Sequence, residues 1–387
     1  MHCKHRSGLL LALLASCACL WADPPTQPDP RQIVELVNQL GSKSYKDRQS
    51  AMQALAKLGR LARPALQEAV NHPDPEISVR AKILLPAAVR DDLNYRLERF
   101  QADTTGKERH DLPGWDRFVE LVGDTPPARK LFAAMLKAQG ELIELALREP
   151  AQARTQLVIL TNQILARPLK HDTNTLHIVQ PGEFYAMLFA ALAPKVNPPL
   201  QASQGLFDLL YKQAILDSLR PTAAEAAPAR KLLAAWLREQ QAGGLYSSQI
   251  VAAIDNLELT EAAAIALALA KNQTLPGRLR AEALVALARV GDKTMLRDIE
   301  PLLTDTSEIG SFFLHQSQGQ TQLRDVALAT LLHLSKSKLS DYEFAVARAG
   351  ESELFFTPIF LGFDSNESRN TALARWRAYR KSADPRP

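Results

Sequence analysis

The sequence predicts an all-α fold, an α-α superhelix of stacked helices with an irregular helical centre. Ala and Leu recur along the chain, and aromatic residues make up only 6% of it. Few Val, Ile, Thr or Tyr runs alternate as half-buried strands require. A hydrophobic share of 46% beside 23% charged residues is typical of a folded chain. At 387 residues, either several domains or one elongated array is expected.

The chain begins with the composition of an export signal, which is expected to cover residues 1–22. Lys4 and Arg6 precede an apolar stretch that is too short to span a membrane. Cleavage at the end of this segment is the simpler expectation. The alternative is lipidation of Cys17, which stands in a Leu-Ala-Ser-Cys sequence and would attach the protein to a membrane. Either way, an exported protein is expected, periplasmic or secreted.

Removal of the signal changes which chemistry the chain can perform. Cys3, Cys17 and Cys19 are the three cysteines, and all lie in the signal, so cleavage after it leaves no thiol for catalysis or zinc binding. Removing Lys4 and Arg6 lowers the formal net charge from +4 to +2. A nearly neutral chain lacks the electrostatic attraction on which general nucleic-acid binding depends.

One pattern recurs along the chain and predicts helical repeats. Arg48 is followed by apolar residues at the third, fourth, seventh and tenth positions, which places them on one face of a helix. Arg280, Arg324 and Arg369 begin further copies, and Arg80 begins a partial one. The last three arginines are about 44 residues apart, the length of a two-helix repeat unit.

These patterns divide the chain into segments. The following boundaries are expected: signal 1–22, flexible linker 23–31, repeats 32–90, irregular helical region 91–244, repeats 245–379 and disordered tail 380–387. The central segment is predicted to hold degenerate repeats, with a separate helical domain as the alternative.

Several stretches resemble HEAT/armadillo-type repeat proteins. Residues 74–81, Asp-Pro-Glu-Ile-Ser-Val-Arg-Ala, are similar to the HEAT consensus of a turn aspartate before a Val-Arg pair. Residues 33–85 and 257–379 resemble an exported bacterial group of HEAT-repeat proteins with no established activity, above all at 322–328 and 361–364, and 112–115 is similar to the same group. The resemblance implies a fold and a compartment but no reaction.

The motif arginines Arg48, Arg80, Arg280, Arg324 and Arg369 are expected to be structural rather than anion-binding. At the start of each second helix, such a side chain can bond the carbonyls or a carboxylate of the preceding turn, as the pair Asp74 and Arg80 suggests.

Only one cluster offers metal ligands. His171, Asp172 and His177 lie close together in a polar loop and could hold a divalent metal, but their spacing matches no known zinc motif. A solvated loop is the favoured interpretation, so no cofactor is expected. Nucleophile and phosphate-loop motifs are absent from the sequence.

Phenylalanines provide the remaining hint of a surface. Phe312 and Phe313 are expected in a long loop from Thr304 to Thr321, and further ones precede the last repeat. Most are expected to seal the end of the array, and the others could anchor a partner.

The sequence therefore predicts an exported, non-catalytic scaffold that binds one or more unidentified proteins, expected on the concave face of its repeats. It predicts no nucleic-acid partner, and a membrane association only if Cys17 is lipidated. The alternative function is that of a HEAT-type lyase or a metal-dependent hydrolase that uses the loop of His171 and His177.

Overall fold

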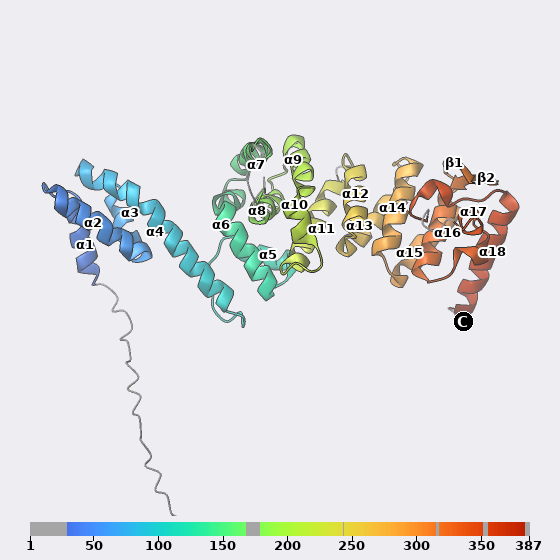
Figure 1. The fold of residues 1–387 in the computed structure, drawn as a ribbon, viewed down its shortest axis with the longest axis horizontal. Coiled ribbons are helices and arrows are strands. Elements are labelled where there is room, and N and C mark those ends of the chain that lie inside the picture. Colours follow the sequence, from blue (N-terminus) through green and yellow to red (C-terminus); the bar gives the residue numbers. More distant parts are fainter. Residues whose placement is uncertain (1–28, 168–178, 243, 315–316, 351–354, 384–387) are drawn as a thin grey trace, which may run out of the picture. The chain divides into compact units, whose positions relative to one another are not determined.

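The computed structural model of the protein is predominantly helical, as the sequence predicts (Figure 1). It describes residues 29–167, 179–242, 244–314, 317–350 and 355–383. The chain forms two compact units, of which the first ends at Tyr95 and the second begins at Arg96. In the part of the chain that the structure describes, no helix is long and apolar enough to cross a membrane.

The helices of the first unit, within the residues that the structure describes, are α1 (Pro30–Gln39), α2 (Tyr45–Leu58), η1 (Gly59–Ala62), α3 (Arg63–Ala69) and α4 (Pro75–Ala102), and α4 continues past the end of the unit. The α-helices of the second unit are α5 (Trp115–Val122), α6 (Pro126–Arg148), α7 (Pro150–Leu165), α8 (Pro181–Ala191), α9 (Leu200–Leu210), α10 (Gln213–Leu219), α11 (Ala226–Ala242), α12 (Ser247–Asn256), α13 (Ala263–Lys271), α14 (Gly277–Val290), α15 (Leu296–Ile299), α16 (Leu323–Leu334), α17 (Ala345–Arg348) and α18 (Asn366–Ala383). Its short 3₁₀ helices and strands are η2 (Thr260–Ala262), η3 (Lys293–Met295), η4 (Glu300–Thr304), η5 (Leu339–Tyr342), η7 (Pro358–Phe360), β1 (Glu308–Leu314) and β2 (Ser317–Gln322).

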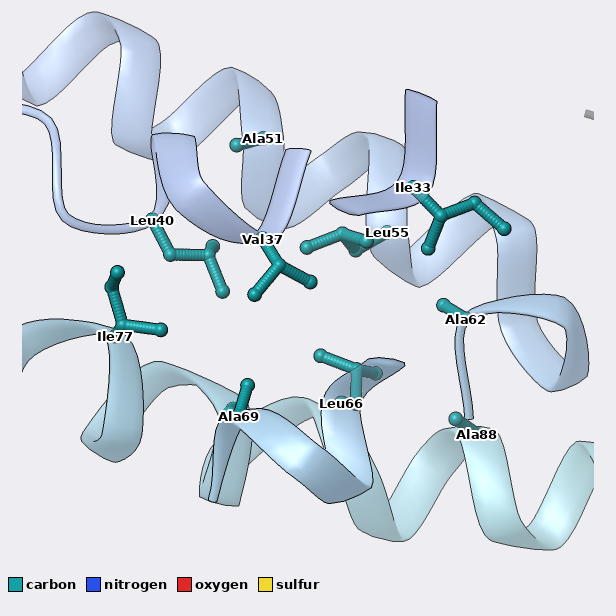
Figure 2. Close-up of a cluster of buried hydrophobic side chains, with 11 residues drawn as sticks. Ile33, Val37, Leu40, Ala51, Leu55, Ala62, Leu66, Ala69, Ile77 and Ala88 are labelled. Atoms are coloured by element: carbon teal, nitrogen blue, oxygen red, sulfur yellow. The ribbon is translucent and has the colours of Figure 1, made fainter. Parts of the chain in front are cut away.

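The core of the first unit lies between its helices. Figure 2 shows Val37 of α1, and Leu40 directly after it, pointing toward Leu66 of α3 and Ile77 of α4, and all four side chains are buried. Leu55 adds the buried face of α2 to the same cluster. Apolar residues at helical spacing in the sequence thus become one contiguous core.

The first helix begins slightly earlier than the sequence predicts. The expected linker ran through residue 31, but α1 starts at Pro30 because the Asp29 side chain accepts a hydrogen bond from the backbone of Arg31. A proline at the first helical position has no backbone N–H to satisfy, so it favours this start.

At the end of α2, Gly59 adopts a φ of 51°, which favours glycine there.

In the second unit, neighbouring helices pack against each other along the chain. The pairs α6 with α8, α7 with α9, α13 with α14 and α14 with α16 are in contact, and α11 also contacts α5, α6 and α8. The described centre of the chain, predicted to be irregular, is helical, and its helix α6 is kinked at Gln139, which has non-helical dihedral angles. The predicted boundary after residue 90 falls inside α4.

The predicted loop from Thr304 to Thr321 is wrong, because it contains an antiparallel hairpin of β1 and β2 in which Phe312 faces Gly319. Phe312 is buried and Phe313 is exposed, as the alternation of a strand requires. A side chain at Gly319 would meet the Phe312 ring at 2.5 Å, so glycine is needed there. Because β2 reads Ser-Gln-Gly-Gln-Thr-Gln, it has no apolar period from which a strand could be predicted.

The expected disordered tail from residue 380 is also partly wrong, because α18 continues to Ala383. Arg380 Nε donates a hydrogen bond to Glu300 Oε1 at 2.6 Å, which fixes this last turn to η4. The Ser382 hydroxyl further donates to the Tyr379 carbonyl.

Candidate functional site

Three of the five motif arginines donate hydrogen bonds to groups of other turns or helices. Arg48 Nη1 donates to the Ser42 carbonyl at 2.8 Å, the kind of bond that the motif predicts. Arg280 is buried, and it donates to the Ala270 carbonyl at 2.9 Å and to Asp305 at 2.6 Å. Buried Arg369 donates to Asp325 and to the Gln320 carbonyl, which lie 44 and 49 residues earlier in the chain. These side chains connect consecutive helices.

The other two motif arginines behave differently. The expected pair of Asp74 with Arg80 does not form, because Arg80 bonds Glu76 within its own helix while the Asp74 carboxylate accepts from the Glu76 backbone. Arg324 is only partly buried and donates to Gln322. It directly follows Leu323, the first residue of α16, whereas Arg280 lies further inside α14, which begins at Gly277. The two arginines therefore occupy different positions in their helices.

Two buried arginines of the central region were missed. Arg129 forms a two-bond pair with Asp124 and donates to the Phe100 carbonyl at 3.0 Å. Arg230 donates to Glu261 and to three backbone carbonyls. Both arginines are followed by apolar residues at the third, fourth and seventh positions, so the motif was readable there. The spacing of these two arginines from the other motif copies does not fit a period near 44 residues, so the period did not indicate them.

The predicted metal ligands His171, Asp172 and His177 lie outside the described residues. Among the residues that the structure does describe, no three His, Cys, Asp or Glu side chains are grouped to hold a metal ion.

The structure instead brings together Asp103 and His110, with His110 Nε2 3.1 Å from Asp103 Oδ2. The Asp103 carboxylate also accepts from the backbone N–H of Glu108 at 3.0 Å, from that of Lys107, and from the Thr105 hydroxyl. Chiefly because of the bond from Glu108, and also those from His110 and Thr105, the pKa of Asp103 lies well below its usual value.

His110 lines a pocket of about 680 Å³. Lys and Arg side chains equal Asp and Glu side chains in number along its lining, and none of its described lining residues is a Ser, Thr or Cys that could act as a nucleophile. Arg129, whose guanidinium lies over the ring of Trp115, and Trp115 itself are among the lining residues. The Asp103 carboxylate holds the turn 103–110 together through these hydrogen bonds.

A second pocket combines exposed apolar side chains with unused polar groups. It has a volume of about 460 Å³ and lies beside the N-terminus of α9, and Leu200 and Leu245 line it. These two leucines are 61% and 67% exposed. The Tyr246 hydroxyl donates to the Leu200 carbonyl at 2.9 Å, which ties the segment before α12 to the start of α9. We call this site the leucine pocket.

The polar lining of the leucine pocket includes a buried hydroxyl. Ser203 is only 3% exposed, and no described residue is hydrogen-bonded to its side chain. Arg117 and Lys195 are basic lining residues and Glu239 is the acidic one. Arg117 donates to the Leu192 carbonyl through one terminal nitrogen, while its Nε is buried without a hydrogen-bond partner.

The backbone around the leucine pocket is shaped by the turn before α9. Lys195 and Asn197 both have positive φ, 68° and 43°, which curves the chain between α8 and α9. Pro199 precedes α9 and offers no side-chain acceptor, so the first N–H groups of the helix receive no cap. The sequence did not reveal this site, because Leu200, Ser203 and Leu245 belong to no motif.

Comparison with family models, with curated proteins and with solved structures gives no match to this chain, so its function must be inferred from the geometry above.

Proposed function

We propose that the protein is an exported, non-catalytic scaffold that binds another protein through a HEAT/armadillo-type helical array. The proposal is supported by helices close in the chain that pack together, such as α13 with α14 and α14 with α16, and by buried arginines that connect successive turns. In such arrays each unit contacts mainly its neighbours and leaves a long surface for a partner.

The observation that carries the proposal is the leucine pocket. Two leucines with most of their surface exposed flank a hollow, whereas the other leucines among the described residues are largely buried. Burying one leucine side chain stabilises a complex by about 1.5–3 kcal/mol. Exposed apolar side chains beside a pocket that also contains a few polar groups are typical of a binding site.

The alternative function, a lyase or metal-dependent hydrolase, depends on His171, Asp172 and His177. No geometry of the described residues supports that alternative, so we propose the binding function alone. A nucleic-acid partner is not proposed, since the mature chain is expected to be nearly neutral.

Affinity capture with matched variants tests the binding function. A tagged wild-type protein, a Leu200→Ser/Leu245→Ser double variant and a Leu147→Ser variant are each recovered from cells and their co-purified proteins compared. Leu147 is a suitable control because it is 39% exposed on α6 and does not line the leucine pocket. We expect a stoichiometric partner with the wild type and the control but not with the double variant. Equal recovery with all three proteins would reject this surface.

Export is tested separately by mass spectrometry of the mature N-terminus. A chain that starts at Asp23 indicates cleavage after Ala22, and a lipidated Cys17 as first residue indicates a membrane-attached lipoprotein. A protein that retains Met1 would contradict export.

A further inference from the structure

The leucine pocket combines an apolar rim with donors for an anion. We infer that it binds the C-terminal carboxylate of a partner polypeptide together with that partner's apolar last side chain. This inference rests on the proposed binding function and names the part of the partner that is recognised.

The N-terminus of α9 supplies the first donors. Its leading N–H groups are uncapped, and the Pro199 carbonyl is used by the N–H groups of Ala202 and Ser203. An exposed helix N-terminus carries a partial positive charge and free N–H groups, which favour a carboxylate.

The hydroxyl of Ser203 supplies a further hydrogen-bonding group. Ser203 is only 3% exposed, but its Oγ is not one of the atoms that are buried without a partner, so the hydroxyl keeps a small contact with the pocket. A hydroxyl in so confined a position is usually hydrogen-bonded to protein or to an ordered molecule beside it. Ser203 lines the pocket and has no partner among the described residues. A ligand oxygen in the pocket would provide this missing bond.

The charges of the lining agree with an anionic ligand. Arg117 and Lys195 provide two positive charges against the single carboxylate of Glu239. Lys195 takes part in no ion pair among the described residues.

A chain end fits the pocket better than an internal acidic residue. Leu200 and Ser203 are one helical turn apart, which is a distance of about 5 Å along the axis. A C-terminal residue carries its carboxylate and its side chain on the same Cα, so it can reach Ser203 and Leu200 together. The side chain would then lie between Leu200 and Leu245.

Fluorescence anisotropy tests the inference directly. The probe is a fluorescein-labelled hexapeptide, Gly-Ser-Gly-Ser-Ala-Leu, with a free C-terminus. It is compared with the same peptide as a C-terminal amide and with an amidated peptide that carries an internal glutamate before the leucine. Each probe is titrated with the full mature chain. We expect the free acid to bind at least tenfold more tightly than either amide, a difference of about 1.4 kcal/mol.

Variants locate the binding to this pocket. Leu245→Ser should abolish it and Ser203→Ala and Lys195→Gln should weaken it several-fold, whereas the control Leu147→Ser should bind as the wild type does. Circular dichroism of each variant checks that the fold is retained.

Equal affinity of the acid and the plain amide would overturn the carboxylate inference. If both peptides bound equally and Leu245→Ser removed the binding of both, the proposed protein-binding function would stand without carboxylate recognition. Equal affinity of the acid and the internal-glutamate peptide would reject the chain end as ligand. Absence of binding by the free acid would also overturn the inference.

Discussion

Asp325 and Arg369 form an ion pair in the interior of the second unit, with Arg369 Nε donating to Asp325 Oδ1 at 2.8 Å. Both side chains are buried. Arg369 also donates to the Gln320 carbonyl at 2.9 Å, and Asp325 accepts from the backbone N–H of Gln322 at the same distance. This pair therefore connects the start of α18 to the start of α16.

Breaking this pair should destabilise the second unit strongly. Arg369→Met leaves the Asp325 carboxylate buried without its partner, and such a loss costs about 3–5 kcal/mol. The double variant Arg369→Met/Asp325→Leu removes both charges and should recover most of the stability. Urea denaturation of the wild type and the variants measures the difference. A single variant within about 1 kcal/mol of the wild type would contradict the buried pair.

Arg230 should be as important as the arginines that the sequence singled out. It donates to the carbonyls of Leu219, Leu257 and Glu258 and to the Glu261 carboxylate. Arg230→Met leaves these acceptors unpaired and should cost about 3 kcal/mol in urea denaturation.

Arg278→Met is the matched control for this variant. Arg278 forms a largely exposed pair with Glu282 in α14, so its loss should cost less than about 1 kcal/mol. Equal effects of the two substitutions would mean that Arg230 is not the connection that the structure indicates.

Gly114 should not tolerate a side chain. Its φ is 83°, and a Cβ atom there would lie 3.0 Å from Cε1 of Phe189. Gly114→Ala should therefore cost about 2–3 kcal/mol in a urea denaturation experiment, from backbone strain together with the displaced ring.

Gly244→Ala separates these two causes. Gly244 has a similar φ of 71° with open space around it, so only the backbone cost of about 1 kcal/mol is expected. If Gly114→Ala were no worse than Gly244→Ala, the close approach of Phe189 would be refuted.

Asp103 should make the stability of the second unit depend on acid pH. The N–H of Glu108 and its other donors lower the pKa of Asp103 in the folded state. A carboxyl with a lowered folded pKa stabilises the fold above its unfolded pKa of about 3.9, and this contribution is lost as the pH falls below that value.

Denaturation of the wild type and Asp103→Asn between pH 7 and pH 2.5 measures this contribution. The difference in unfolding free energy between the two proteins should stay constant above about pH 5 and shrink below about pH 4. A difference that grows on acidification would have the wrong sign for these hydrogen bonds.

The fold was predictable where its signal is local and repeated. Apolar residues at helical spacing predicted the helices, and the buried faces of α2, α14 and α16 are those that the pattern indicates. The hairpin was not predictable, because β2 carries no alternating apolar residues, and Phe312 is placed by its pairing with Gly319 rather than by a sequence pattern.

The candidate site could not be predicted from spacing either. Leu200 and Leu245 are distant in the sequence, and they line one pocket only because α9 and α11 fold together around it. Ser203 is an ordinary helical serine in the sequence, and its lack of a partner becomes visible only in the folded chain.

Site-specific photo-crosslinking shows whether the leucine pocket contacts a partner protein in the cell. A benzophenone amino acid is placed at position 245 in one variant and at position 147 in another, and both are irradiated in the cells that produce the protein. We expect a discrete crosslinked product from position 245 that is absent at position 147. The same products from both positions, or none from position 245, would contradict this contact.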